Sequence, residues 1–229
     1  MKSYESLLEY YRKCFSLVDS FHFNSSVAKK QYDKVLNIAD ATQVVLPITH
    51  TGIQDHREHK CFDSNVLRLG FVGHETPYKG LPLLKNVLGN IDVSKWRLDV
   101  WGGRIGQDEN LPVFYRGKFN QKNISQVYAE MDLLVVPSVW QETFSLVTLE
   151  ALSYGVPVLA SSNVGAKDVV KEYDSSFIYE STDELLEKLE MMVADRGSLR
   201  VYNQAILQKE WRHDMRNHAS EVIKKIYEM

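Results

Sequence analysis

Two short and almost entirely apolar segments, residues 133–137 (LLVVP) and 156–160 (VPVLA), constrain the fold of this chain more than any other feature of its sequence. Such a run indicates a strand that is covered on both faces, because a strand with one solvated face would alternate apolar and polar residues. Strands of this kind occur in parallel sheets that carry helices on both sides. With a helical pattern at 145–154 between them, the two segments predict an α/β fold with a parallel sheet flanked by helices.

The rest of the chain continues this alternation, most clearly after residue 65. There we expect strands at 67–72, 97–101, 113–116 and 177–179, a short helix at Val169 and Val170, and helices at 79–88, 125–131, 182–194, 199–210 and 214–229. Before residue 65 we expect a helix at 4–19, a strand at 20–24, a helix from Ser25 or Ser26 to 35, and a strand at 44–47. Residues 48–65 have no clear period and are rich in threonine, histidine and charge, which predicts a linker.

Length and charge narrow the class of protein. The chain has 229 residues, too long for one average domain and too short for two. Its 27 basic and 30 acidic residues give a net charge of −3, so we expect no nucleic-acid partner. Only two cysteines and no apolar signal segment favour a cytoplasmic protein. No apolar stretch approaches the roughly 20 residues of a membrane-spanning helix. A stripe of Leu7, Leu8, Tyr11 and Phe15 allows peripheral membrane contact at most, and packing against the α/β domain expected after residue 65 is the favoured use.

The first chemical signal lies in residues 73–80 (GHETPYKG), which join a buried strand to a helix start. Gly73 and Gly80 allow close backbone approach, the helix start offers free N–H groups to an anion, and Lys79 adds a positive charge. The loop has neither the GxxxxGK[ST] nor the GxGxxG spacing. Taken alone, it is equally compatible with an ordinary connection that carries a solvated lysine.

The second signal lies in residues 138–150, where Glu142 and Glu150 form an E-x7-E pattern after an apolar strand. Glu150 stands in the apolar segment LVTLEAL, so its carboxylate needs a partner. Paired hydroxyls of a polyol would suit it, and a salt bridge to lysine or arginine is the alternative. For Glu150 considered alone, the salt bridge is favoured.

The context of this pattern, PSVWQETFSLVTLEALSYGVPVLAS, resembles the signature of the group 1 glycosyltransferases, retaining enzymes with two Rossmann-like domains (GT-B). The matching positions are Pro137, Ser138, Glu142, Phe144, Leu146, Leu149, Glu150, Ala151, Gly155, Pro157 and Val158. The stretches LGFVGHETPYKGLPLL, LDVWGG and FYRGKFNQKNISQVYAEMDLLVVPS resemble further family segments. More weakly, HFNSSVAKKQYDKV and THTGI resemble the end of the family's N-terminal domain.

The resemblance implies how the chain is divided. Residues 65–229 would be a Rossmann-like domain that binds a nucleotide-sugar, the C-terminal half of a GT-B fold. Residues 1–64 would be a helical and strand remnant, namely the tail of the acceptor domain plus the linker.

The resemblance also implies roles for individual residues. Lys79 would hold the donor diphosphate and stabilise it as it departs, and Glu142 would contact the donor sugar, which makes these two the candidate catalytic residues. Glu150 would accept hydrogen bonds from the ribose hydroxyls. Further donor-binding candidates are Gly73, His74, Gly102, Gly103, Tyr115 to Gly117 near the base, and the backbone of Thr143, Phe144, Ser145 and Leu146.

Two of these positions depart from the family pattern. His74 stands where the family usually has arginine, and histidine is only partly charged near neutral pH and lacks the bidentate fork of arginine. Ser145 stands where the family usually has glycine.

The implied function is transfer of a sugar, with retention, from a nucleotide-diphosphate sugar to a glycan or a lipid-linked saccharide, with no cofactor or metal. The alternative is a non-catalytic nucleotide-sugar-binding module, or a regulatory chain that works with a separate N-terminal-domain polypeptide. A glycosidase-like carboxylate pair and a Rossmann dehydrogenase are disfavoured. His56, His59 and Cys61 could be metal ligands, but a solvated linker is much the better explanation. The sugar, the base, the acceptor and the oligomeric state stay open.

Overall fold

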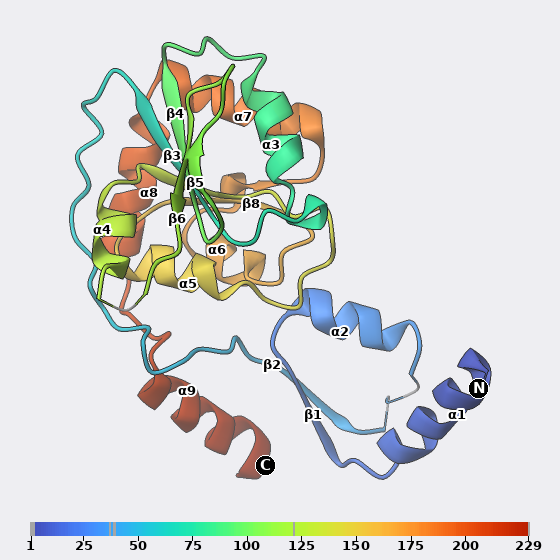
Figure 1. Ribbon diagram of the computed structural model, residues 1–229. Helices are drawn as coiled ribbons and strands as arrows, with labels where there is room; N and C mark the ends of the chain where they lie inside the picture. Colours follow the sequence, from blue (N-terminus) through green and yellow to red (C-terminus); the bar gives the residue numbers. More distant parts are fainter. Residues whose placement is uncertain (1–2, 37, 39, 121, 229) are drawn as a thin grey trace.

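The larger part of the chain is built on a mostly parallel sheet (Figure 1). In the computed structural model, which describes residues 3–228 apart from 37, 39 and 121, this sheet has seven strands in the order β5-β6-β4-β3-β7-β8-β9. The bounds are β3 (Leu67–Val72), β4 (Trp96–Trp101), β5 (Ile105–Gln107), β6 (Val113–Gly117), β7 (Leu133–Val136), β8 (Val158–Ser161) and β9 (Ile178–Tyr179). The pairing of β5 with β6 is antiparallel, and the other pairings are parallel.

Helices cover both faces of this sheet. The bounds are α3 (Leu81–Leu88), α4 (Ile124–Ala129), α5 (Leu146–Ser153), α6 (Lys167–Tyr173), α7 (Thr182–Ala194) and α8 (Gly197–Gln208), with 3₁₀ turns η1 (Pro77–Lys79) and η2 (Ser175–Phe177). The connections from β3 to β4 through α3 and from β7 to β8 through α5 run in opposite directions across the sheet. Right-handed crossovers therefore place α3 and α5 on opposite faces.

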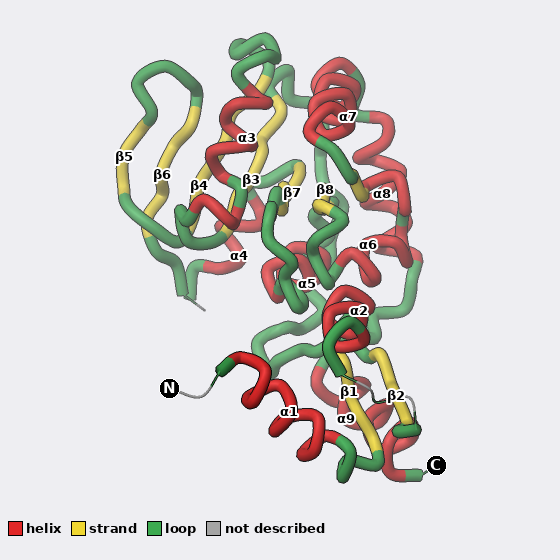
Figure 2. The backbone as a smooth tube through the Cα atoms, turned by 90° about the vertical axis from the view of Figure 1, so that its right-hand side faces the viewer, coloured by secondary structure: helices red, strands yellow, loops and turns green. Residues whose placement is uncertain are grey.

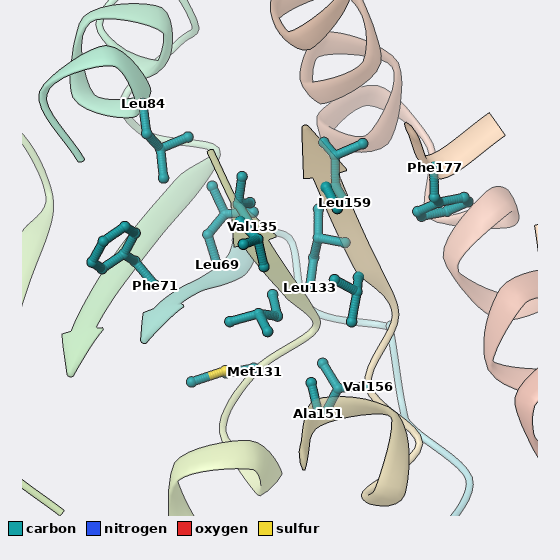
Figure 3. Close-up of a cluster of buried hydrophobic side chains, with 14 of the residues drawn as sticks. Leu69, Phe71, Leu84, Met131, Leu133, Val135, Ala151, Val156, Leu159 and Phe177 are labelled. Atoms are coloured by element: carbon teal, nitrogen blue, oxygen red, sulfur yellow. The ribbon is translucent and has the colours of Figure 1, made fainter. Parts of the chain in front are cut away.

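The hydrophobic core lies between the sheet and these helices. All residues of β7 and β8 are buried, which confirms that the two apolar segments form strands covered on both faces. Figure 3 shows Leu84 of α3 approaching this core from one side and Ala151 of α5 from the other, with Leu133 and Val135 of β7 between them.

A smaller N-terminal unit packs against the large domain. Strand β1 (Ser20–Phe23) pairs in parallel with β2 (Thr42–Val45), and the unit also contains α1 (Tyr4–Phe15) and α2 (Ser26–Asp33). Helix α9 (Met215–Val222), continued by the π-helical turn η3 (Ile223–Tyr227), returns from the large domain to this unit (Figure 2). The ring centroids of His22 in β1 and His218 in α9 are 5.9 Å apart.

The N-terminal unit is also joined to the large domain through the start of α2. The Ser25 hydroxyl caps this helix by accepting a hydrogen bond from the Ala28 N–H, and it donates to the Thr143 carbonyl at 2.5 Å. The backbone N–H and hydroxyl of Ser26 donate to the two oxygens of Asp168 at 2.7 and 2.8 Å. Two adjacent serines thus join α2 to the segments that follow β7 and β8.

The structure differs from the sequence expectations in several places. The helix expected from 79 begins at Leu81, because Gly80 adopts a φ of +82° after the 3₁₀ turn. Strand β5 was not expected, since its three residues are all exposed and carry no apolar alternation. The helix expected at 4–19 ends at Phe15. Of the helix expected at 214–229, residue 229 lies outside the described residues.

The linker expected at 48–65 is irregular, but it is not simply solvated. Ile53 and Phe62 are buried in the core of the large domain. The Arg57 guanidinium donates to the carbonyls of Ile206 and Lys209 at 2.5 and 2.7 Å. Two isolated apolar residues and one arginine thus hold the segment against the large domain. They are too far apart in the sequence to show a hydrophobic period.

Candidate functional site

The direction of the sheet connections changes between β3 and β7. From β3 the chain moves to β4 on one side, whereas from β7 it moves to β8 on the other. At such a switch point the loops that follow the two strands separate and leave a crevice at the carboxyl edge of the sheet, where ligands bind in open α/β folds. The loop after β3 carries Lys79 and the loop after β7 carries Glu142, so the two signals of the sequence meet at this edge.

Glycines follow three neighbouring strands at the same edge. The N–H of Gly73 donates to the carbonyl of Trp101 at 2.9 Å, and the N–H of Gly102 donates to the carbonyl of Gly117 at 2.8 Å. Gly102 has a φ of +114°, and a Cβ there would lie 2.8 Å from the Gly73 oxygen, so a larger residue would push the two loops apart. These glycines therefore let the backbones of neighbouring loops approach closely beside Lys79.

Lys79 and Glu142 form an ion pair across the crevice. The Lys79 Nζ lies 2.9 Å from the Glu142 Oε2, with side-chain exposures of 35% and 11%. The other carboxylate oxygen of Glu142 accepts a hydrogen bond from the Ser138 hydroxyl at the end of β7. The structure thus brings together both candidate catalytic residues, with the carboxylate held and the lysine more open to solvent.

The loop that carries Glu142 is held by backbone hydrogen bonds to the segment after β8. The N–H of Glu142 donates to the carbonyl of Asn163 at 3.0 Å, and the N–H of Gly165 donates back to Glu142 at 3.1 Å. The N–H of Ala166 donates to the carbonyl of Phe144 at 2.8 Å, and the Phe144 side chain is buried. Phe144 therefore anchors the loop, while Thr143 is exposed beside it.

Helix α5 starts from a strained residue. Ser145 has φ +106° and ψ 86°, and it is the one non-glycine residue with positive φ in the described part of the chain. Within that part, the Ser145 hydroxyl caps none of the backbone N–H groups of the helix. The first N–H groups of a helix lack partners in the helix itself, so those of Leu146 and the next residue are available to an anion.

Glu150 lies in the second turn of α5, and its partners differ from those expected. Its Oε2 accepts a hydrogen bond from the Tyr128 hydroxyl at 2.7 Å, and its Oε1 lies 3.6 Å from the His50 Nε2. The salt bridge to lysine or arginine that was favoured for Glu150 alone is therefore wrong. The Glu150 side chain keeps 15% exposure, which leaves it room to accept a further hydrogen bond.

Tyr128 is well suited to hold this carboxylate. Burial, and then the neighbouring Glu150 charge, raise the pKa of the Tyr128 hydroxyl well above its usual value, so it remains a donor at neutral pH. Its ring stacks on Tyr154, with centroids 5.4 Å apart, and Tyr154 stacks on His56 at 5.1 Å. The Lys60 Nζ donates to the Tyr128 carbonyl at 2.6 Å.

The remaining candidates lie around this edge of the sheet. His74 is exposed in the loop after β3. Tyr115 is buried in β6, and the Arg104 guanidinium lies 4.0 Å from its ring centroid. Arg104 also pairs with Glu75, at 3.3 Å. Contact of these residues with a base stays a prediction.

Sequence reasoning gave no role to Tyr128, Ser138, Asn163 or Arg104. Tyr128 and Ser138 lie inside stretches that resemble the family, and this resemblance could have drawn attention to them. Their roles depend on which side chain meets which carboxylate, and spacing alone does not contain that information. Asn163 and Arg104 act through tertiary contacts between loops.

The structure also bears on metal binding and on the membrane. Within residues 3–228, leaving out 37, 39 and 121, His, Cys, Asp and Glu side chains form no group of three or more that could hold a metal ion, and this includes His56, His59 and Cys61. In the same part of the chain, we find no helix with the length and apolarity that a bilayer crossing requires.

Comparisons with known proteins agree with this fold. A family model described as "Glycosyl transferases group 1" matches residues 52–210. An uncharacterized 41.2 kDa protein in the cps region of Klebsiella pneumoniae is 33% identical over 124 residues, which make up 51% of this chain and 34% of that protein. Sulfoquinovosyl transferase SQD2 of Arabidopsis thaliana is 29% identical over 161 residues, or 66% of this chain and 31% of that protein.

Among solved structures, HepE of Anabaena in complex with UDP and glucose matches with a TM-score of 0.75 at 15% identity, over 99% of this chain and 68% of that one. This likeness shows the fold, which is that of GT-B glycosyltransferases. The matched segments span about a third of the two curated relatives. Since the family model covers residues 52–210 of 229, including both loops of the switch point, the chain belongs to the group 1 glycosyl transferases.

Proposed function

We propose that this chain binds a nucleotide-diphosphate sugar at the switch point and takes part in transferring the sugar, with retention, to a saccharide or lipid-linked acceptor. The observation that carries the proposal is the Lys79–Glu142 pair, 2.9 Å apart at the carboxyl edge of the sheet beside Gly73 and Gly102. A diphosphate needs cationic and N–H partners, and a sugar needs hydrogen-bond acceptors. This edge offers both within one crevice.

Each residue has a distinct task in this proposal. Lys79 exchanges its contact with Glu142 for the diphosphate and stabilises the charge that develops as the nucleoside diphosphate leaves. Glu142, released from Lys79 but still bonded to Ser138, accepts hydrogen bonds from the sugar hydroxyls. Glu150, oriented by Tyr128, accepts hydrogen bonds from the ribose. The N–H groups at the start of α5 face the phosphate and sugar.

The two carboxylates do not resemble the acid and base of a glycosidase. Glu142 is ion-paired with a lysine, and Glu150 accepts a hydrogen bond from a tyrosine in a separate group of residues. Neither is arranged as a free proton donor opposite a free base. This supports front-face transfer, in which the departing phosphate assists the incoming acceptor and the anomeric configuration is retained.

The comparisons support the choice of ligand. HepE, whose fold this chain shares, was crystallised with UDP and glucose, and the name of SQD2 describes a sulfoquinovosyl transferase. A uridine donor is therefore the first to test.

A second candidate is a non-catalytic nucleotide-sugar-binding module or regulatory chain, which would work with a separate N-terminal-domain polypeptide. The exposed His74, in place of a permanently charged arginine, favours it, because the diphosphate would have one fewer fixed cation. Release of nucleoside diphosphate by the chain in the presence of an acceptor would contradict this candidate.

Calorimetric titration with UDP- and GDP-sugars tests the proposal. Lys79→Ala and Glu150→Ala should each weaken binding about tenfold or more, since each removes a charge-assisted hydrogen bond. Lys95→Ala is the matched control, because Lys95 is an exposed lysine just before β4, at the opposite edge of the sheet. Absence of binding to every nucleotide-sugar at millimolar concentration would refute the proposal. The anomeric configuration of the product, read by NMR, tests retention.

A further inference from the structure

A basic cleft of about 460 Å³ lies between the N-terminal unit and the large domain. Two of its lining lysines come from α2 and its C-terminal cap, and two come from α6. They are Lys30, Lys34, Lys167 and Lys171. The cleft is also lined by polar side chains from the loops after β7 and β8, among them Gln141 and Asn163.

The four lysines of this cleft form no ion pairs in the described part of the chain. Among the described residues, none of the four lysines has a carboxylate oxygen within 4.0 Å. Lys167 donates instead to the Ser162 carbonyl at 2.6 Å, and Lys34 to the Gln31 side-chain oxygen at 3.1 Å. Of the described lining residues, Glu180 is the one acid. By contrast Lys29, also on α2, pairs with Asp33 at 2.9 Å.

The lysines of the two helices are close enough to affect one another. Burial, followed by repulsion from Lys171, lowers the pKa of Lys167, and Lys30 of α2 lowers it further, while Asp168 and Glu180 oppose the change. Asp168 is itself engaged by two hydrogen bonds from Ser26. The contact that brings α2 onto α6 therefore gathers like charges, an arrangement that an anion between the helices would stabilise.

The position of the cleft distinguishes it from the donor site. Lys79 approaches Glu142 from the β3 side of the switch point, whereas Lys167 and Lys171 lie beyond β8. The cleft and the donor site lie next to each other. Gln141, which lines the cleft, precedes Glu142, and the carbonyl of Asn163, another lining residue, accepts the Glu142 N–H at 3.0 Å. A molecule anchored in the cleft would thus reach toward the donor sugar from the side opposite to the donor diphosphate.

We propose that this lysine cleft binds the phosphate or diphosphate group of the acceptor. Four lysine side chains and the Gln141 side chain line the cleft next to the loop of Glu142, and phosphate oxygens are strong acceptors for such a set of donors. Naming the bound group as part of the acceptor rests on the proposed function, whereas anion binding in the cleft does not. A soluble sugar phosphate and a lipid-linked phosphate headgroup share this chemistry.

Calorimetric titration of the whole chain with inorganic diphosphate tests the cleft. Lys30→Gln/Lys34→Gln and Lys167→Gln/Lys171→Gln should each weaken binding by about tenfold or more, because each pair removes two charge-assisted contacts. Lys29→Gln, on the same helix but paired with Asp33, should leave this binding unchanged. Lys30 and Lys34 are exposed, so the first double variant retains the fold.

Lys79→Gln separates the cleft from the donor site. Diphosphate binding that survives Lys79→Gln and is lost in the cleft variants supports the proposal. Binding that is lost only in Lys79→Gln, or equal losses in Lys29→Gln and the cleft variants, overturns it. No detectable binding of diphosphate at millimolar concentration also overturns it.

A second arm distinguishes the two sources of the anion. Phosphatidylcholine vesicles with and without phosphatidic acid are sedimented with the wild-type chain and with both cleft variants. Cosedimentation that requires phosphatidic acid and the four lysines supports a lipid headgroup as the source. Lysine-dependent binding of diphosphate without cosedimentation supports a soluble phosphate.

Titration with UDP in parallel keeps the two proposals apart. UDP binding that depends on Lys79, with diphosphate binding insensitive to the cleft variants, refutes the cleft and retains the proposed function. Lysine-dependent diphosphate binding in a chain that binds no nucleotide retains the cleft and refutes the proposed function.

Discussion

Replacing Ser145 with glycine should stabilise the protein. Ser145 has φ +106° and ψ 86°, where the Cβ of an L-residue crowds its own backbone. Within the described part of the chain its hydroxyl caps none of the N–H groups of α5, so the substitution removes strain and loses no capping bond.

The size of the effect follows from two opposing contributions. A non-glycine residue held in the left-handed region costs about 1–3 kcal/mol. Glycine also destabilises the folded protein by roughly 0.5–1 kcal/mol, because it increases the conformational freedom of the unfolded chain. The net stabilisation is therefore about 1 kcal/mol, which corresponds to a rise of about 2–4 °C in Tm for a chain of this length.

Thermal unfolding and urea denaturation of the wild type, Ser145→Gly and Ser145→Ala measure this effect. The alanine variant is the control: it removes the hydroxyl and keeps the Cβ, so its stability should remain close to that of the wild type. A glycine variant no more stable than the alanine variant would refute backbone strain at this position. A gain shared equally by both variants would assign the effect to the hydroxyl instead.

Three further predictions test other parts of the structure. Tyr128→Phe removes the hydrogen bond to Glu150 and should weaken UDP binding about tenfold in calorimetry; unchanged affinity would show that Tyr128 does not orient this carboxylate. Burial, followed by repulsion from nearby cations, lowers the pKa of His213 from 6.5 to about 4, so its neutral form is favoured in the folded protein. As the pH falls from 6.5 to 4 the unfolded chain binds a proton that the folded chain does not, so this residue should reduce the free energy of unfolding by up to about 3 kcal/mol. Urea titrations across that pH range should show that the free energy of unfolding falls less with pH in His213→Asn than in the wild type. An equal pH dependence in both proteins would contradict the assignment. Gly80→Ala would place a Cβ 1.8 Å from the Pro137 carbonyl oxygen at a φ of +82°, and should destabilise the protein by about 3 kcal/mol or more, with wild-type stability as the refuting result.

The strands of the large domain could be predicted because their signals are local. Segments 133–137 and 156–160 were expected to be buried strands, and every residue of β7 and β8 is buried. Strand β5 was missed because it is short and exposed, and its hydrogen bonds to β6 form through tertiary pairing. The sequence predicts a solvated linker at 48–65, because its two buried residues, Ile53 and Phe62, are too far apart to show a period.

The candidate site also combines features that the sequence predicts with features that only the structure shows. Lys79 and Glu142 were recognised from loop composition and family resemblance, and the structure places them in one ion pair. Glu150 was also recognised from the sequence. The lysine or arginine partner predicted for it alone is wrong, because Tyr128 and His50 lie beside its carboxylate. Tyr128 lies 22 residues earlier in the chain, and only the packing of α4 beside α5 brings its hydroxyl to the carboxylate.

The sequence by itself determined which segments are strands and helices, which loops follow the strands, and to which family the chain is similar. Those properties depend on residue type and spacing over short stretches. Only the tertiary structure decided the partners of the charged groups: the pairing of Lys79 with Glu142, the hydrogen bond from Tyr128 to Glu150, and the four lysines gathered between α2 and α6. The reason is physical, because the strength of a charge interaction depends on distance and burial, and both are set by segments that are remote in the chain.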